Sequence, residues 1–126
     1  RNFEQDPLRV MIVDDNEAAA KSLCELWEKN GRRTLAAYTG TEGVERAIAE
    51  RPDVALLDIG LPDIDGYGVA RTLRAHFGVS IKLIALTGYG QEEDRDKARA
   101  AGFDDHLVKP VSIVDVERTL SSLKKA

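Results

Sequence analysis

Five short apolar segments alternate with amphipathic segments along this chain, and this alternation limits the folds that it can adopt. The apolar segments are rich in Val, Ile and Leu, and most are apolar on both faces, which is typical of parallel strands covered by helices on two sides. Strands are therefore predicted at 8–13, 33–38, 53–58, 81–87 and 104–108. Short connections between strands and helices favour right-handed crossovers and a doubly wound α/β sheet.

Apolar residues recur three or four positions apart in the intervening segments, which is the spacing of helices with one apolar stripe. The stripes consist of Ala20, Leu23, Cys24 and Trp27; Val44, Ala47 and Ile48; Val69, Ala70, Leu73 and Phe77; and Ile113, Val116, Leu120 and Leu123. Glycines stand where three helices would stop, at Gly31, Gly78 and Gly102. Thr39 and Ser112 would cap the second and fifth helices. The segment near 91–101 offers mostly alanines for burial, so we expect it to form the most weakly anchored helix.

Composition places the chain among globular proteins of one domain. It has 126 residues, of which 43% are hydrophobic and 32% are charged, and this size and balance suit a single packed core. The net charge of −4 argues against extensive binding to nucleic acid or acidic membranes. Residues 1–7 lack periodicity and are interpreted as a leader or linker, and residues 8–126 as the folded domain.

Cysteine usage and the lack of targeting signals indicate the compartment. Cys24 is the single cysteine, so no internal disulfide forms and a reducing compartment is favoured. No apolar stretch approaches the roughly 20 residues that span a bilayer, and no signal peptide is recognisable. We therefore expect a cytoplasmic protein without membrane insertion. Because the sequence begins with Arg1 rather than Met, we interpret it as a processed product or a part of a longer protein.

Polar residues suited to phosphate chemistry stand at the ends of four predicted strands. In chain order they are Asp14, Asp15, Asp58, Thr87 and Lys109. The carboxyl ends of parallel strands lie at one edge of a sheet, where ligands bind at the point at which the strand order reverses. We therefore expect three carboxylates, a hydroxyl and an ammonium group in one cleft.

Three carboxylates in one cleft would raise one another's pKa, and a bound cation removes this repulsion. Ligands that are all oxygen favour Mg²⁺, with Mn²⁺ as an alternative. A carboxylate beside such an ion can attack phosphorus and form an acyl phosphate. Lys109 would balance the charge that develops on the phosphoryl oxygens, and the Thr87 hydroxyl would donate to them. The cluster therefore predicts phosphoryl transfer to an aspartate.

Each of these residues also has a simpler interpretation when it is taken alone. Asp14 and Asp15 would cap a helix. Asp58 and Thr87 would be turn residues, and Lys109 would be an ordinary surface lysine. The placement of all five at one edge of the sheet favours the functional interpretation.

Four short motifs follow one another on the predicted strand ends. They are Val-Asp-Asp-Asn at 13–16, Leu-Leu-Asp-Ile-Gly-Leu-Pro-Asp-Ile-Asp-Gly at 56–66, Ala-Leu-Thr-Gly at 85–88 and Lys-Pro at 109–110. In this order they resemble the receiver domain of two-component response regulators, and the resemblance covers residues 8–124. It implies a flavodoxin-like, five-stranded parallel sheet of strand order 2-1-3-4-5 with five helices.

The resemblance implies roles for the acidic residues and the loop that follows them. Asp58 would accept the phosphoryl group. Asp14 and Asp15 would hold Mg²⁺ together with Asp58, and the backbone carbonyl of Gly60 would be a further ligand.

The resemblance also implies a switch next to the phosphate. Thr87 would move toward the phosphoryl group and Lys109 would pair with it, and the peptide bond before Pro110 would be cis. His106 stands where the family usually carries Tyr or Phe as a rotamer switch. A smaller imidazole, which titrates near neutrality, would take that place here.

Two further positions bear on the lifetime of the phosphorylated state. In the family, the positions of Gly60 and Tyr89 flank the path of the water that hydrolyses the phosphoaspartate. Neither residue offers an acid or an amide that would orient this water. We therefore expect a long-lived phosphoaspartate.

The chain is interpreted as a signalling switch and not as a conventional enzyme. A histidine kinase or a histidine phosphotransfer protein would donate phosphate to Asp58 in a phosphorelay. The surface of the fourth helix, fifth strand and fifth helix would then change for a downstream output domain or protein. Direct binding to nucleic acid is not expected. The loop that begins at Gly60 is similar to that of receivers fused to hybrid histidine kinases.

Three other interpretations remain open from the sequence. The first is a protein-interaction module that is never phosphorylated. The second is a hydrolase with an aspartyl-phosphate intermediate, although such enzymes usually carry a second Asp where this chain has Gly60. The third is a flavin-binding domain, although no phosphate loop rich in Ser and Thr follows the first strand.

Overall fold

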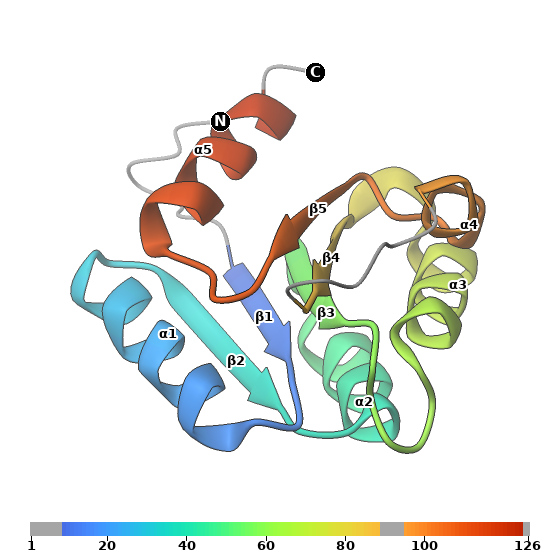
Figure 1. Cartoon of the computed structure of the whole chain (residues 1–126), viewed down its shortest axis with the longest axis horizontal. Coiled ribbons are helices and arrows are strands. Elements are labelled where there is room, and N and C mark those ends of the chain that lie inside the picture. Colours follow the sequence, from blue (N-terminus) through green and yellow to red (C-terminus); the bar gives the residue numbers. More distant parts are fainter. Residues whose placement is uncertain (1–8, 89–94, 125–126) are drawn as a thin grey trace.

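A five-stranded parallel sheet with helices on both faces forms the protein (Figure 1). The computed structural model describes residues 9–88 and 95–124. The strand order is β2-β1-β3-β4-β5, which confirms the predicted flavodoxin-like fold. The strands are β1 (Arg9–Val13), β2 (Arg33–Ala37), β3 (Val54–Asp58), β4 (Lys82–Thr87) and β5 (Asp105–Val108), each within one residue of its predicted bounds.

Two helices cover one face of the sheet and three cover the other (Figure 1). Helices α1 (Glu17–Lys29) and α5 (Ile113–Lys124) lie on the first face. Helices α2 (Gly40–Glu50), α3 (Gly66–Phe77) and α4 (Arg95–Ala101) lie on the second. A short 3-10 helix, η1 (Gly78–Ser80), leads from α3 into β4. None of the helices in the described ranges has the length and apolar character needed to cross a membrane.

Successive side chains of each strand enter two separate apolar layers, because side chains alternate across a sheet. In β1, Met11 and Val13 pack beneath α2 and α3, whereas Val10 and Ile12 pack with Trp27 beneath α1 and α5. Every residue of β3 is buried. With both faces of the sheet covered, polar side chains gain access to solvent mainly at the strand ends.

Side-chain caps fix where the helices begin. Thr39 accepts a hydrogen bond from the Glu42 N–H, and Ser112 accepts one from the Asp115 N–H, as the sequence predicted. Two further caps, on α1 and α3, were not predicted. They are Asn16, which accepts from the Ala19 N–H, and Asp65, which accepts from the Gly68 N–H.

Most of the predicted helix stripes face the sheet, and one prediction is wrong. Trp27 is fully buried, as expected, but Ile48 keeps 42% of its surface exposed. The face of α2 that meets the sheet is centred on Gly43 and Ala47. Ile48 follows Ala47 by one position and is therefore rotated about 100° away from that face. The side chain of Leu123 lies outside the described residues.

Helix α4 is described from Arg95 onward, and 91–94 lie outside the described residues. Ala98 and Ala101 are its buried positions, with 8% and 3% of their surface exposed. Both were predicted from the sequence.

An aspartate in the loop between β3 and α3 ties that loop to the start of α2. Asp63 accepts hydrogen bonds from the N–H groups of Gly40 and Thr41 at 2.8 and 2.9 Å, and from the Thr41 hydroxyl at 2.6 Å. The first N–H groups of a helix lack partners within the helix, and a negative charge there is favoured by the helix dipole. The bonds from Thr41 and its neighbours hold the pKa of Asp63 well below its usual range.

We expect Asp63→Asn to lower the melting temperature at neutral pH and to make the melting temperature less sensitive to acid. A carboxyl whose pKa is depressed on folding stabilises the fold fully above its ordinary pKa of 3.8, and this contribution is lost as the pH falls through and below that value. The melting temperatures of variant and wild type, followed by circular dichroism, should therefore converge between about pH 5 and pH 2. Glu45→Gln, an exposed neutralisation on α2, is the control. A difference in melting temperature between Asp63→Asn and wild type that stays constant across this pH range would contradict the role assigned to the Asp63 carboxylate.

Candidate functional site

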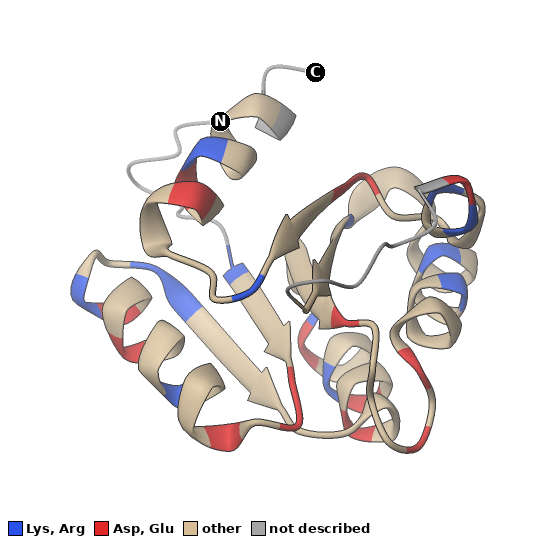
Figure 2. Ribbon diagram, viewed as in Figure 1, with Lys and Arg blue, Asp and Glu red and all other residues tan. Residues whose placement is uncertain are grey.

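The polar residues predicted at the strand ends meet at one edge of the sheet. Asp58 and Thr87 are the last residues of β3 and β4, Asp14 and Asp15 directly follow β1, and Lys109 directly follows β5. In Figure 2 the acidic segments after β1 and β3 and the basic segment after β5 lie toward the same edge. Strands β1 and β3 are adjacent although the chain reaches β2 between them, so this edge lies where the strand order reverses.

The three carboxyl groups are close enough to share one ion. Asp14, Asp15 and Asp58 each offer an oxygen, and these oxygens all lie within 4.8 Å of one another. Asp14 and Asp58 are buried, with 3% and 9% of their surface exposed, whereas Asp15 is exposed. The cluster is therefore rooted in the protein interior and open to solvent on the side of Asp15.

Lys109 bridges the two buried carboxylates. Its Nζ lies 2.8 Å from Asp58 Oδ2 and 3.0 Å from Asp14 Oδ2. Burial alone would lower the pKa of Lys109, but the hydrogen bonds with Asp58 and Asp14 outweigh it and raise the pKa above its ordinary value. Burial raises the pKa of Asp14, against the lowering effects of the Asn16 N–H and of Lys109. The lysine is thus firmly charged and partly neutralises the cluster.

Backbone groups fix the orientation of both buried carboxylates. The Gly60 N–H donates to Asp58 Oδ1 at 2.9 Å, and the Asn16 N–H donates to Asp14 Oδ1 at 3.0 Å. The start of α3 approaches the same loop closely, since a Cβ at Gly66 would lie 2.6 Å from the Asp58 carbonyl oxygen. Each carboxylate therefore has one oxygen held by the backbone and one that faces Lys109.

The loops after β4 and β5 are joined next to the cluster. The Lys109 N–H donates to the Thr87 carbonyl oxygen at 2.7 Å, and the peptide bond between Lys109 and Pro110 is cis. The Thr87 side chain is fully buried, and its hydroxyl donates to the Leu107 carbonyl oxygen at a long distance of 3.5 Å. The hydroxyl is thus turned toward β5.

A cavity of about 170 Å³ lies behind Thr87, between β4, β5 and α4. Its walls include Thr87, His106, Tyr67, Ala98 and Phe103. The His106 side chain is 26% exposed, and its Nδ1 lies 3.9 Å from a carboxylate oxygen of Asp105. Thr87 and His106 therefore line one pocket, which is partly open to solvent.

The residues at this edge fit a divalent cation of the Mg²⁺ type. Their donors are all carboxylate oxygens, which such hard ions prefer, and Mg²⁺ needs only one or two carboxylates because it keeps several waters. The exposed side of the cluster leaves room for those waters, because among the described residues a Cβ at Gly60 would touch only Asp58 Oδ1, at 3.6 Å.

Two of the simpler interpretations do not hold in this structure. Asn16, and not Asp14 or Asp15, caps α1. Lys109 is not an ordinary surface lysine, because it pairs with both buried carboxylates. Tyr89, which the sequence associates with the phosphate lifetime, lies outside the described residues.

The parallel sheet of order β2-β1-β3-β4-β5, with three carboxylates and a lysine where its strand order reverses, is the arrangement that the resemblance to receiver domains implied. The family model of the response regulator receiver domain matches residues 10–121. The chain belongs to this family, whose members are signalling switches rather than conventional enzymes.

Curated relatives are 33–37% identical to the chain over the aligned residues. The polar-differentiation response regulator DivK of Brucella anthropi is 33% identical over 92% of this chain and 95% of its own length. Protein PilH of Pseudomonas aeruginosa is 34% identical over 91% of this chain and 96% of its own. The KDP operon transcriptional regulatory protein KdpE of Escherichia coli is 37% identical over 88% of this chain, which spans 48% of that regulator.

Solved structures share the fold. A CheY-like receiver domain protein from Methanospirillum hungatei superposes with a TM-score of 0.84 at 30% identity and covers 92% of both chains. The receiver domain of sensor histidine kinase PA1611 from Pseudomonas aeruginosa has a TM-score of 0.81 at 28% identity and covers 94% of this chain and 98% of its own. That structure is described with a magnesium ion coordinated in the active-site cleft.

Proposed function

We propose that Asp58 accepts a phosphoryl group from the phosphohistidine of a kinase or phosphotransfer protein, and that Asp14, Asp15, Asp58 and the Gly60 carbonyl hold Mg²⁺ for this step. The observation that carries the proposal is the bridging of two buried carboxylates by Lys109 within 3.0 Å. Such a cluster is costly for a purely structural role, and it matches what phosphoryl transfer to a carboxylate requires.

The reaction is a displacement at phosphorus. A carboxylate oxygen of Asp58 forms the bond to phosphorus while the bond from phosphorus to the donor's imidazole nitrogen breaks, and that nitrogen keeps the electron pair. The metal supplies charge stabilisation for the phosphoryl oxygens when it is bound. Lys109 adds a positive charge that is already aimed at Asp58 Oδ2, 2.8 Å away, so little reorganisation accompanies the transfer.

Thr87 and His106 form the switch in this proposal. The Thr87 hydroxyl makes only a 3.5 Å bond to the Leu107 carbonyl, which is weak by its length. A phosphoryl oxygen on Asp58 offers this hydroxyl a shorter, charge-assisted bond. Movement of Thr87 enlarges the shared cavity, and the His106 imidazole turns inward to fill it.

The movement of Thr87 and His106 alters the protein surface that α4, β5 and α5 form. This surface carries two exposed valines in the described residues, Val108 and Val114, with 48% and 61% of their surface accessible. Exposed apolar residues on a face that responds to phosphate suit contact with an output domain or a downstream protein. We propose a population shift between two states of this surface.

We expect Asp58→Asn to abolish labelling of the protein by acetyl phosphate with Mg²⁺ present. The amide cannot form the acyl phosphate, while the fold should persist. Asp96→Asn is the control, because that carboxylate is 97% exposed on α4, and it should be labelled like the wild type. Labelling of the Asp58 variant at the wild-type rate would refute the phosphoacceptor, and a wild type that is never labelled would favour the plain interaction module.

Mn²⁺ offers a local test of the metal site, because its unpaired electrons broaden nearby NMR signals. We expect the amides of 14–16 and 58–60 to broaden first and those of η1, at the opposite end of the sheet, to stay sharp. Asp15→Asn should weaken Mn²⁺ binding by about tenfold or more, whereas Glu17→Gln on the first turn of α1 should not. Broadening scattered over the acidic surface would contradict a single site.

Trp27 fluorescence would be a poor reporter for the same binding. Trp27 lies ten positions beyond the start of α1, which places it about 15 Å along the helix from the cluster.

The lifetime of the phosphoaspartate follows from the two positions that flank its water. We propose a long lifetime, because Gly60 provides no side chain beside Asp58. Since the nearest atom of the described residues to a Cβ at this position is Asp58 Oδ1 at 3.6 Å, an asparagine fits there without displacing their backbone.

Introducing an amide and an acid should therefore shorten the lifetime. We expect Gly60→Asn combined with Tyr89→Glu to release radiolabelled phosphate about tenfold faster than the wild type. Gly60→Ala is the matched control, since it adds a Cβ without a group that binds water. An unchanged rate in the double variant, or an equal acceleration in Gly60→Ala, would count against this explanation.

A further inference from the structure

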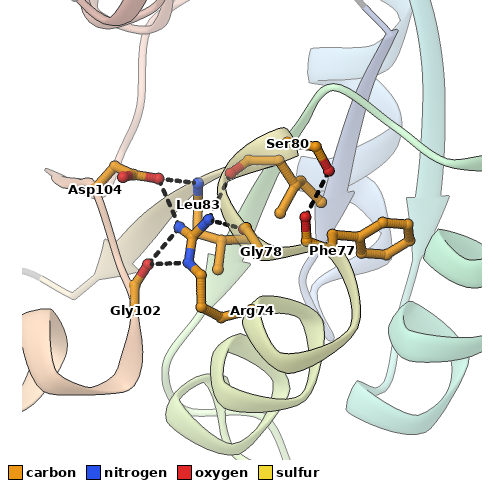
Figure 3. A network of polar contacts seen from close by, with 8 residues as sticks. Arg74, Phe77, Gly78, Ser80, Leu83, Gly102 and Asp104 are labelled. Atoms are coloured by element: carbon orange, nitrogen blue, oxygen red, sulfur yellow. Dashed lines mark hydrogen bonds and ion pairs between the residues drawn. The ribbon is translucent and has the colours of Figure 1, made fainter.

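Arg74 on α3 binds two separate segments that lead into β4 and β5, at the opposite end of the sheet from the acidic cluster. Figure 3 shows this network. A guanidinium group has five N–H donors, and all five are used. Nε donates to the Gly102 carbonyl oxygen at 3.2 Å. Nη1 donates to the carbonyl oxygens of Gly78 and Ile81 at 2.5 and 2.8 Å. Nη2 donates to the Gly102 carbonyl oxygen at 2.6 Å and to Asp104 Oδ2 at 2.8 Å.

The Asp104 carboxylate extends this network to the sheet (Figure 3). Its Oδ2 also accepts from the Leu83 N–H on β4 at 2.8 Å, and the Asp104 N–H donates to the Leu83 carbonyl oxygen at 2.7 Å. The residue that leads into β5 is therefore bound to α3 and to β4 at once.

Gly102 fits this arrangement for two reasons. Its φ of +108° ends α4 in a conformation that other residues rarely adopt. A Cβ at this position would also lie 3.1 Å from the Arg74 Cβ and 3.2 Å from its Nε. The arginine side chain is thus packed directly against the end of α4.

Little apolar area anchors the described part of α4 apart from this end. Its buried positions there are the two alanines, Ala98 and Ala101. A cation–π contact, with Lys97 Nζ 4.6 Å from the centre of the Tyr67 ring, joins its exposed side to α3. Alanines bury little apolar area, and an exposed cation–π contact adds about 0.5–1 kcal/mol.

We propose that Arg74 is a positioning residue that fixes the carboxyl end of α4 and the entry to β5 against α3 and β4. Within the described part of α4, the backbone is then most firmly held at its carboxyl end. This inference concerns residues outside the acidic cluster and does not depend on phosphate or metal.

Residue-resolved amide hydrogen exchange on the unphosphorylated protein without Mg²⁺ tests the proposal. In the wild type, protection should rise along 99–103 toward the carboxyl end. Arg74→Lys keeps the charge but loses the forked donors. It should speed exchange at 102–104 by about tenfold or more and remove the gradient, while the amides of β1 stay within about twofold.

Two further variants separate a local role from general destabilisation. Arg71→Lys, at an exposed position on the same helix, should leave all rates unchanged. Asp104→Asn should speed exchange at the same residues as Arg74→Lys, and the double variant should be no faster than the more affected single one, because both act through one network.

Three results would overturn the proposal. One is protection in the wild type that is greatest at residue 99. Another is exchange in Arg74→Lys that stays at the wild-type rate at 102–104 or accelerates equally in β1. The last is full additivity of the two substitutions.

Discussion

The contact of Lys109 with Asp14 and Asp58 is the interaction on which the site depends. It joins the ends of β1, β3 and β5, which are far apart in the sequence, around buried negative charge. Removing one partner of a buried ion pair leaves the other charge uncompensated and destabilises the fold by about 3–5 kcal/mol. The loss of stability here should lie toward the lower end of that range, because the lysine remains partly exposed. The sheet must therefore hold its strand ends together, and the two apolar layers beneath its faces provide that rigidity.

This arrangement bears on how a change at Asp58 would spread under the proposed function. Asp58 Oδ1 is held by the Gly60 N–H and Oδ2 by Lys109. The Thr87 hydroxyl, in contrast, makes a long bond of 3.5 Å to the Leu107 carbonyl oxygen. A phosphoryl group on Asp58 would, in this proposal, act first on Thr87 and then on the pocket that Thr87 lines with His106.

The sequence was sufficient for the fold and for the convergence of Asp14, Asp15, Asp58 and Lys109 at one edge of the sheet. It was insufficient for the contacts that join distant loops. Strand bounds follow from local apolar patterns, and the cleft follows because parallel strands end at one edge. Asp63 and Arg74 carry no such signal. From the sequence alone, an aspartate in a loop is interpreted as a turn residue and an arginine on an amphipathic helix as a solvated residue. The hydrogen-bond partners of both lie about 20 to 30 residues away in the sequence. Ile48 was misplaced because the spacing of a short helix does not fix its rotation about its axis.

The division of the interior into two apolar layers means that the protein has two halves that can be altered separately. Residues beneath α1 and α5 do not share a cluster with those beneath α2, α3 and α4, yet the acidic cleft draws on strands that belong to both. A substitution in one layer therefore changes the packing on one face of the sheet directly, and it reaches the helices on the other face only through the strands that both layers share.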